Sequence, residues 1–344
     1  MSTLRKRIRQ IIRAVRGDNT EELLQVEIKR LKQKIRQTKV MQEILRLPLE
    51  LVRLDMGLPF EKSPKLPIEK LIMGSSLGEF QAYRIPADGL VFYAPHLAGV
   101  PDNGETMTDG FLHRLMEKRA WPVETISSLL ALTHGRTMLD IGANIGLTSI
   151  PRAVLGLFDH IHAFEPEPRN LCCIRQAIIE NALTDRMTAW HAAVGQTDGD
   201  IEFSVTDGMA RHHVHYGTYD PKELVKVPVV SLDKWAASAG IEPHDVRFIK
   251  VDTQGFEPHI LKGAKSFLKV PNVAWQLEVH LPLMNAAGTT AEEFGAQIQR
   301  GFKAFLDLRD IGAGLRSTRE IFDVLDRLQG STSYTDIVAI TKGA

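Results

Sequence analysis

The stretch 137–148 constrains the fold of this chain more than any other part of the sequence. A β-branched and apolar run ends at an acid, Asp140, and a loop with Gly142 and Gly146 then leads into small and apolar residues. This pattern predicts a buried strand, a tight loop and the start of a helix. Gly142 and Gly146 leave room for close approach, and Asn144 tolerates a left-handed backbone, so the loop is predicted to meet a ligand.

The loop favours S-adenosylmethionine over a dinucleotide. A G-x-G-x-x-G pattern that starts at Gly142 would need its second and third glycines at positions 144 and 147, but these residues are Asn144 and Leu147. A carboxylate at Asp140 would repel a pyrophosphate, whereas it would attract the ammonium and sulfonium groups of S-adenosylmethionine. A nucleotide-dependent oxidoreductase is the alternative class of enzyme.

A second acid, Glu165, follows the next predicted strand. It lies 23 residues after Gly142 (165 − 142). In nucleoside-binding βαβ units, an acid about 20 residues after the glycine loop accepts hydrogen bonds from the ribose hydroxyls. Each charge-assisted bond of this kind contributes roughly 1.5–3 kcal/mol. The alternative is that both acids merely end strands, but their spacing favours the nucleoside interpretation.

Predicted strands alternate with predicted helices from residue 137 onward. Strands are expected at 138–141, 161–164, 187–194, 246–252 and 275–280, helices at 145–157, 168–181 and 258–268, and an added strand pair at 201–205 and 227–230. A strand at 302–308, a helix at 317–328 and a strand at 336–340 are expected to close the sheet with an antiparallel pair. This order predicts an α/β fold with a doubly wound, mostly parallel sheet, which binds its ligand at the carboxyl ends of the strands.

Four motifs in this order resemble the FkbM-type methyltransferases. They are Asp140-Ile141-Gly142-Ala143-Asn144-Ile145-Gly146, Phe164-Glu165-Pro166, Ser231-Leu232-Asp233 and Ile249-Lys250-Val251-Asp252-Thr253-Gln254-Gly255-Phe256-Glu257. The resemblance covers about residues 120–340. It implies a class I methyltransferase (Rossmann-like) fold, S-adenosylmethionine as methyl donor, and a hydroxyl acceptor on a sugar, polysaccharide or polyketide. The chain departs from the family at Thr253-Gln254, where Val-Glu is more usual.

The resemblance also implies roles for particular residues. Cofactor contacts are expected from Asp140, Gly142, Ala143, Asn144, Gly146, Glu165 and Pro166. Asp252 would lie beside the transferring methyl group and would hold or deprotonate the acceptor hydroxyl; the alternative is a helix cap or a salt bridge to Lys250. Alignment supplies on the order of 7–11 kcal/mol in such a displacement, and a general base adds roughly 10²–10⁴-fold.

Glu257 and His280 are further catalytic candidates. Glu257 opens the helix after Asp252, where an acid is also stabilised by the helix dipole without any catalytic role. His280 ends the predicted strand 275–280 and could serve as a base, since an unperturbed imidazole has a pKa near ~6.5. A histidine at such a position is alternatively structural.

The N-terminal part predicts two further segments before the methyltransferase domain at 121–344. Residues 1–56 are predicted to form a helical extension, which is basic because positions 1–46 hold thirteen Lys and Arg against five acids while the whole chain balances 42 against 42. Within the extension, the amphipathic stretch 1–16 predicts peripheral membrane contact, with a solvated helix as alternative. The stretch 20–47 predicts homo-oligomerisation through a coiled-coil seam, or packing on its own domain. Residues 57–120 read as a linker (57–70) and a small cap over the cofactor site.

The remaining sequence features concern the cellular compartment and the possible ligands. Cys172 and Cys173 are adjacent and cannot staple distant segments, and no apolar run of 18 residues or secretory signal occurs, which predicts a cytoplasmic protein. The insertion 207–221 contains three histidines without ligand partners at metal-site spacing, so it predicts a substrate-covering loop and no metal. No nucleic-acid partner is expected. A non-catalytic binding protein that retains the methyltransferase fold is the alternative outside the enzymes.

Overall fold

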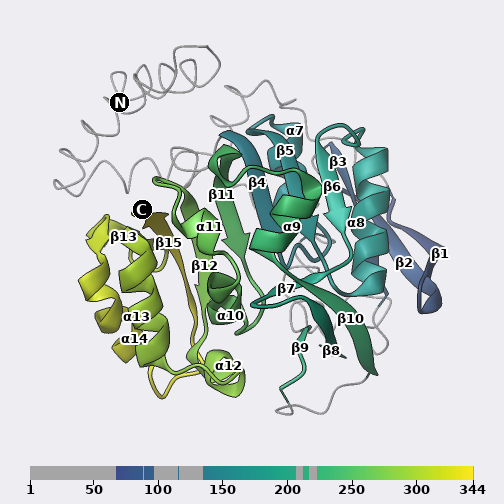
Figure 1. Cartoon of the computed structure of the whole chain (residues 1–344). Helices are drawn as coiled ribbons and strands as arrows, with labels where there is room; N and C mark the ends of the chain where they lie inside the picture. Colours follow the sequence, from purple (N-terminus) through teal and green to yellow (C-terminus); the bar gives the residue numbers. More distant parts are fainter. Residues whose placement is uncertain are drawn as a thin grey trace.

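The computed structural model describes residues 67–87, 89–96, 115, 135–206, 212–216 and 223–343 (Figure 1). The predicted segments 1–16 and 20–47 and most of the insertion 207–221 lie outside the described residues. The membrane contact, the self-association and the domain boundaries therefore stay predictions.

An eight-stranded sheet forms the centre of the molecule, with the spatial order β14-β13-β15-β12-β11-β4-β5-β6. Its strands are β4 (Gly135–Ile141), β5 (Phe158–Phe164), β6 (Met187–Trp190), β11 (Val246–Val251), β12 (Ala274–Val279), β13 (Phe302–Asp307), β14 (Arg316–Ser317) and β15 (Thr335–Thr341). The five strands from β12 to β6 pair in parallel, while β15 lies antiparallel between β12 and β13. This arrangement confirms the predicted doubly wound, mostly parallel sheet and its antiparallel ending.

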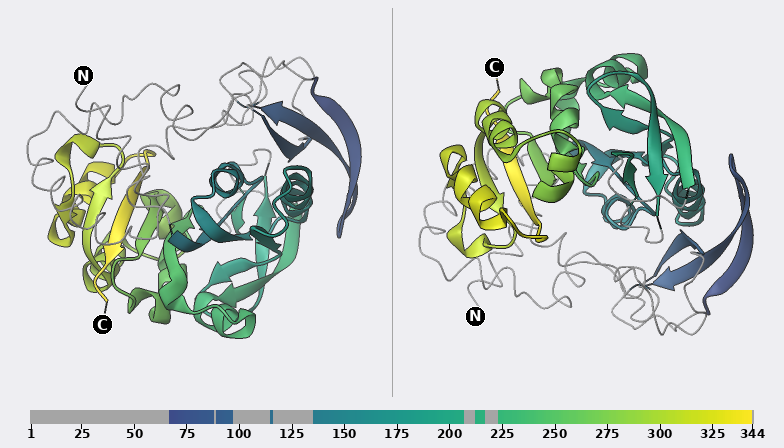
Figure 2. Two further views of the ribbon diagram at one scale, coloured as in Figure 1. Left: turned by 90° about the horizontal axis from the view of Figure 1, so that it is seen from above. Right: turned by 90° about the horizontal axis from the view of Figure 1, so that it is seen from below.

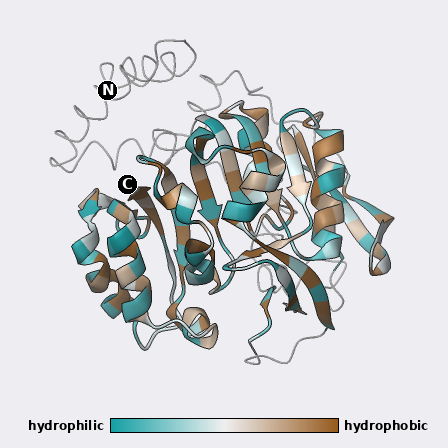
Figure 3. Ribbon diagram, viewed as in Figure 1, coloured by the Kyte–Doolittle hydropathy of each residue, from teal (hydrophilic) through white to brown (hydrophobic). Residues whose placement is uncertain are grey.

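Helices cover both faces of this sheet, which explains why its central strands are apolar on both sides. Along β4, Met138 faces the core that contains α7 and α8, while Leu139 faces the opposite core. Neighbouring β11 repeats the alternation with Phe248 and Ile249, and all four side chains are buried. Figure 3 shows the resulting concentration of hydrophobic residues in the central strands.

The helices are short, and several carry identifiable start signals. They are α7 (Ser149–Val154), α8 (Pro168–Glu180), α9 (Leu232–Ala239), α10 (Glu257–Lys262), α11 (Lys265–Leu268), α12 (Leu281–Ala286), α13 (Ala291–Gly301) and α14 (Ile321–Leu328). Glu167 caps α8, and Thr290 with Glu293 forms a capping box at α13, which the sequence pattern T-x-x-E could have revealed. In the part of the chain that the structure describes, no helix is long and apolar enough to span a membrane.

Several predicted boundaries are corrected. Residues 145–148 lie in turns, so the first helix starts at Ser149 and not at Ile145. The predicted helix 258–268 is two helices, because Gly263 lies against Gly195, whose carbonyl oxygen would be 2.1 Å from an added Cβ. The predicted strand 187–194 is also two elements, β6 and β7 (Ala193–Gly195).

A second sheet, in the order β7-β10-β8-β9, continues from β7 at the carboxyl end of the central sheet (Figure 1). It comprises β7, β8 (Gly199–Val205), β9 (His213–Val214) and β10 (Glu223–Ser231). β8 and β10 pair antiparallel, which confirms the added strand pair.

A third sheet contains β1 (Glu69–Ser75), β2 (Gly78–Ala87) and β3 (Leu90–Pro95) and packs on the outer side of α8 (Figure 2). Arg84 pairs with Glu180, and the Val91 N–H donates to the Asn181 side chain at 2.9 Å. These contacts lie at the C-terminal end of α8, away from the carboxyl edge of the central sheet. Two residues of the predicted linker, 69 and 70, belong to β1, and closure of a cap over the carboxyl edge stays a prediction.

Candidate functional site

The candidate site lies where the chain changes direction across the central sheet. From β4 the strands proceed to β5 and β6 on one side, and later to β11 and β12 on the other. Crevices of this kind, outside the carboxyl ends of the strands, are the usual ligand sites of doubly wound sheets. The loop 142–146 after β4 and the turn 252–255 after β11 meet at this point.

The backbone of the loop 142–146 is left-handed at three residues: Gly142, Asn144 and Gly146 have φ of 76°, 54° and 83°. An added Cβ at Gly142 would lie 2.0 Å from the Asp252 carbonyl oxygen, and one at Gly146 would lie 2.7 Å from the Ile150 side chain. The approach of a ligand to these glycines stays a prediction. They make room for the neighbouring turn and helix.

All five backbone N–H groups of this loop are used inside the protein. Those of Gly142 and Ala143 donate to the Phe164 carbonyl (3.1 and 3.0 Å), that of Asn144 to Glu165 Oε2 (2.7 Å), that of Ile145 to Asn144 Oδ1 (2.8 Å) and that of Gly146 to the Ala143 carbonyl (2.8 Å). Phosphate-binding loops instead present free N–H groups to the anion. This loop is therefore not a phosphate cradle.

Glu165 lies at the carboxyl end of β5, as predicted, and is 4% exposed. Its Oε2 accepts from the Asn144 N–H, and its Oε1 accepts from the Glu167 N–H at 2.9 Å. Burial raises the pKa of Glu165 to about 8, although both N–H groups oppose the shift. The Asn170 side chain also hydrogen-bonds Glu165, so the ionised carboxylate, with about four lone pairs, keeps at least one for a hydroxyl donor. Next to it, Pro166 is buried.

The raised pKa of Glu165 predicts that its replacement changes the pH dependence of stability. The folded state holds the Glu165 proton up to about pH 8, whereas the unfolded state loses it near the ordinary value of about 4.5. The free energy of unfolding must therefore fall as pH rises from about 4.5 to about 8. Glu165→Gln removes the titrating group that causes this fall in unfolding free energy. We therefore expect the melting temperature of the variant to decline less than that of the wild type between about pH 4.5 and about pH 8. Thermal denaturation from pH 5 to pH 8.5 measures the difference.

The exposed Glu79 of β2 supplies the matched control for this experiment. Glu79→Gln should leave the slope of melting temperature against pH at the wild-type value. Parallel curves for the wild type and Glu165→Gln would contradict the raised pKa.

Asp140 is fully buried, and its contact with the cofactor stays a prediction. The Ser149 hydroxyl donates to its Oδ2, and its Oδ1 lies 3.6 Å from Lys250 Nζ. A second buried cation, Arg152, interacts with the Asp140 charge; burial lowers the pKa of Arg152 to about 10, and Asp140 opposes the shift. Asp140 therefore connects β4 to the start of α7, through Ser149, and to β11, through Lys250.

Asp252 is the accessible acid of the site, with its side chain 42% exposed at the end of β11. Its Oδ2 lies 3.2 Å from Lys250 Nζ, so the salt bridge considered as the alternative is present. Burial alone would lower the pKa of Lys250, but Asp252, Asp140 and Asp336 together raise it, so Lys250 is cationic. Lys250 thus joins the ends of β4 and β11.

Gln254 connects two acids at this edge, a contact that the motif did not predict. Its backbone is left-handed (φ 56°), and its Nε2 donates to Asp252 Oδ1 at 3.3 Å and to Glu278 Oε2 at 2.9 Å. Burial first, and then neighbouring acids, raise the pKa of Glu278 well above its usual range. An amide suits this position because it donates to both carboxylates, which an ionised Glu could not do. The departure from the family's Val-Glu was the available signal.

Glu257 and His280 both have structural contacts, and their catalytic roles stay predictions. The fully buried Glu257 accepts from the N–H and hydroxyl of Thr253 (2.8 and 2.9 Å) and from the Gly255 N–H (3.0 Å). Burial raises its pKa to about 7. His280 caps α12 by accepting the Leu283 N–H at 3.3 Å, and burial lowers its pKa. These residues shape the turn and helix around Asp252.

The described part of the insertion, 212–216, lies against the turn after Asp252. The Tyr216 hydroxyl donates to the Gln254 carbonyl at 3.4 Å, and its ring stacks on Phe256 with centroids 6.4 Å apart. The histidines have separate partners: His212 accepts from the Thr206 N–H, and His215 pairs with Ser204. Among the described residues, no three His, Cys, Asp or Glu side chains form a metal-binding group.

Comparison with known proteins gives one family match. A family model described as the methyltransferase FkbM domain matches residues 140–311, half of the 344 residues. No curated protein sequence matches the chain.

The solved structures that match this chain share little sequence with it. Methyltransferase FkbM from Methylobacillus flagellatus KT is 15% identical, with 60% of this chain and 44% of that chain covered and a TM-score of 0.34. The match thus spans less than half of that protein. TYW2 of P. horikoshii, in complex with MeSAdo, is 14% identical over 76% and 72% of the chains (TM-score 0.37). TYW2 of M. jannaschii, in complex with AdoMet, is 11% identical over 82% and 90% (TM-score 0.36).

Proposed function

The chain belongs to the FkbM methyltransferase family, and from this premise we propose that it transfers a methyl group from S-adenosylmethionine to a hydroxyl of a sugar, polysaccharide or polyketide-type acceptor. The observation that carries the proposal is the combination at the ends of β4 and β5. There the loop N–H groups 142–146 are all internally bonded, while Glu165 keeps acceptor capacity. Such a site favours a nucleoside without phosphates.

The residues at this edge fit S-adenosylmethionine, which when bound supplies an electrophilic methyl group on its sulfonium. Glu165 would accept the ribose hydroxyls, and the loop 142–146, with Gly142 and Asn144 partly exposed, would lie along the nucleoside. The proposed contribution of Asp140 is indirect, through Ser149 and Lys250. Ala143 and Pro166 are buried beside these groups and would shape the surface.

Asp252 is the residue proposed to bind the hydroxyl of the methyl acceptor. Its carboxylate is accessible, lies at the end of the strand next to β4, and is held by Lys250 and Gln254. An oriented carboxylate can accept the proton of an acceptor hydroxyl and align its oxygen for in-line attack. Lys250 and Gln254 favour one orientation of the Asp252 carboxylate.

Calorimetry with S-adenosylhomocysteine and NAD tests the cofactor assignment. We expect saturable binding of S-adenosylhomocysteine and none of NAD, because the loop has no free N–H groups for a pyrophosphate. At pH 9, where Glu165 with its pKa of about 8 is ionised, Glu165→Gln should weaken S-adenosylhomocysteine binding about 10- to 100-fold, the loss of one or two charge-assisted hydrogen bonds. Glu79→Gln again serves as the control. Tight binding of NAD without response to S-adenosylhomocysteine would favour the oxidoreductase alternative.

The non-catalytic alternative requires a separate measurement. A binding protein with this fold would take up S-adenosylhomocysteine but would not turn over the methyl donor. Transfer of a tritiated methyl group from S-adenosylmethionine into an extract of the source cells separates the two. We expect incorporation with the wild-type protein that Glu165→Gln reduces.

A further inference from the structure

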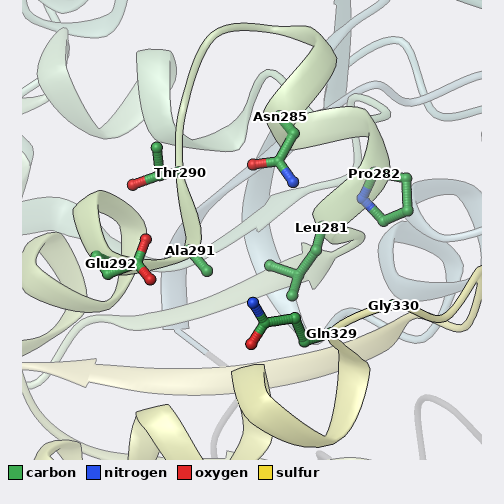
Figure 4. A pocket seen from close by; sticks show the side chains of 8 residues that line it. All are labelled: Leu281, Pro282, Asn285, Thr290, Ala291, Glu292, Gln329 and Gly330. Carbon is green, nitrogen blue, oxygen red and sulfur yellow. The ribbon is translucent and has the colours of Figure 1, made fainter.

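A pocket of about 280 Å³ opens between α12, the start of α13 and the segment that leads into β15 (Figure 4). Its polar lining comes from Asn285, Thr290, Glu292 and Gln329, and its apolar lining from Leu281, Pro282 and Ala291. Because α12 follows the carboxyl end of β12, the pocket lies at the same edge of the sheet as Asp252. None of these side chains takes part in the site described above.

The helix α12 connects this pocket to the turn after Asp252. At Gly255 an added Cβ would lie 2.5 Å from the Leu283 carbonyl carbon, so α12 packs directly on the turn. Leu281 and Asn285 of the same helix line the pocket. A helix with its side chains is about 10–12 Å across. A ligand in the pocket therefore lies about one helix diameter from the turn that holds Asp252.

The lining matches an uncharged molecule that carries several hydroxyl groups. Asn285 and Gln329 each offer both donors and an acceptor, Thr290 offers a hydroxyl, and Glu292 offers acceptors. Leu281 and Pro282 provide an apolar surface suited to the C–H face of a sugar ring. The volume lies at the lower end of the roughly 300–1,000 Å³ of small-molecule sites, which suits a single ring.

The charges of the lining disfavour an anion. Glu292 is its one charged side chain among the described residues, and no Lys, Arg or His lines the pocket there. The positive end of the α13 dipole also lies here, but Glu292 and Glu293 occupy the first turn and offset it. A phosphate or carboxylate ligand would therefore meet net negative charge.

We propose that this pocket binds a neutral sugar unit of the acceptor, apart from the unit whose hydroxyl is methylated. The proposal rests on the proposed function and narrows it, since it requires a saccharide acceptor long enough to reach from the pocket around α12 to Asp252. The pocket fixes one unit on one side of α12 while a unit further along the same saccharide presents its hydroxyl to Asp252.

Saturation-transfer NMR on the full chain tests this proposal, with S-adenosylhomocysteine present and the methyl glycosides of glucose, galactose, mannose and rhamnose as probes. We expect at least one glycoside to bind the wild type. Asn285→Leu and Gln329→Leu should each weaken that binding about three- to tenfold, the effect of losing a neutral hydrogen bond. Gln81→Leu removes an exposed amide from β2 and should leave it unchanged.

The proposal is overturned if none of the four glycosides binds the wild type, or if both pocket variants bind as tightly as Gln81→Leu. Calorimetry with S-adenosylhomocysteine keeps this outcome separate from the proposed function. Retained binding in Asn285→Leu and Gln329→Leu shows that these variants are folded. If the wild type binds S-adenosylhomocysteine but none of the glycosides, the sugar pocket alone is overturned. If the wild type does not bind S-adenosylhomocysteine, the methyltransferase proposal is overturned.

Discussion

Replacing Asp252 by Asn is expected to lower turnover by about 10²–10⁴-fold, the usual contribution of a general base. The substitution keeps the size of the side chain and removes its ability to take a proton. S-adenosylhomocysteine binding should stay within about threefold of the wild type, because the proposed nucleoside contacts come from Glu165 and the loop 142–146. Single-turnover methyl transfer and calorimetry on the same preparations measure the two quantities.

Asp200 provides the matched control for Asp252→Asn. It forms an ion pair with Lys226 at 3.0 Å on the second sheet, and both side chains are more than half exposed. Surface pairs of this kind contribute roughly 0–1 kcal/mol, so Asp200→Asn should change neither turnover nor binding. Full turnover in Asp252→Asn would refute the role of this carboxylate and leave alignment as the main source of rate enhancement.

The second large effect is expected from Gly142→Ala. The new methyl group would lie 2.0 Å from the Asp252 carbonyl oxygen, and the backbone at Gly142 has a left-handed φ of 76°. Left-handed strain costs roughly 1–2 kcal/mol and overpacking roughly 1–3 kcal/mol, so we expect a loss of about 2–5 kcal/mol in unfolding free energy. Relief of the clash would separate β4 from the turn after β11. Cofactor binding should therefore fall as well.

Gly240→Ala separates the two causes of this loss. Gly240 has a similar φ of 68°, and an added Cβ there would meet no atom within 4 Å. Its variant reports the backbone strain alone, so the difference between the two variants gives the cost of the clash. Chemical denaturation of both variants measures it. Equal losses would contradict the close approach of Gly142 to Asp252.

Local patterns were sufficient for the main elements of the fold. The apolar alternation of β4, β5 and β11 and the acids at their ends are properties of short segments, so the sequence predicted the parallel sheet and placed Glu165 and Asp252 at its carboxyl edge. The helix boundaries were less accurate. Gly263 ends α10 because β7, nearly seventy residues earlier in the chain, packs against it, and no local pattern contains that contact.

The sequence by itself determined which residues stand at the strand ends, because periodicity and turn chemistry act over a few positions. Only the tertiary structure decided what each side chain does there. Asp140 turned inward to Ser149 and Lys250, Glu257 closed a turn, and Gln254 joined two acids, because burial and charge partners depend on which strands become neighbours. Gly142 shows the same dependence: the pairing of β4 with β11 brings Asp252, 110 residues away (252 − 142), against its missing side chain.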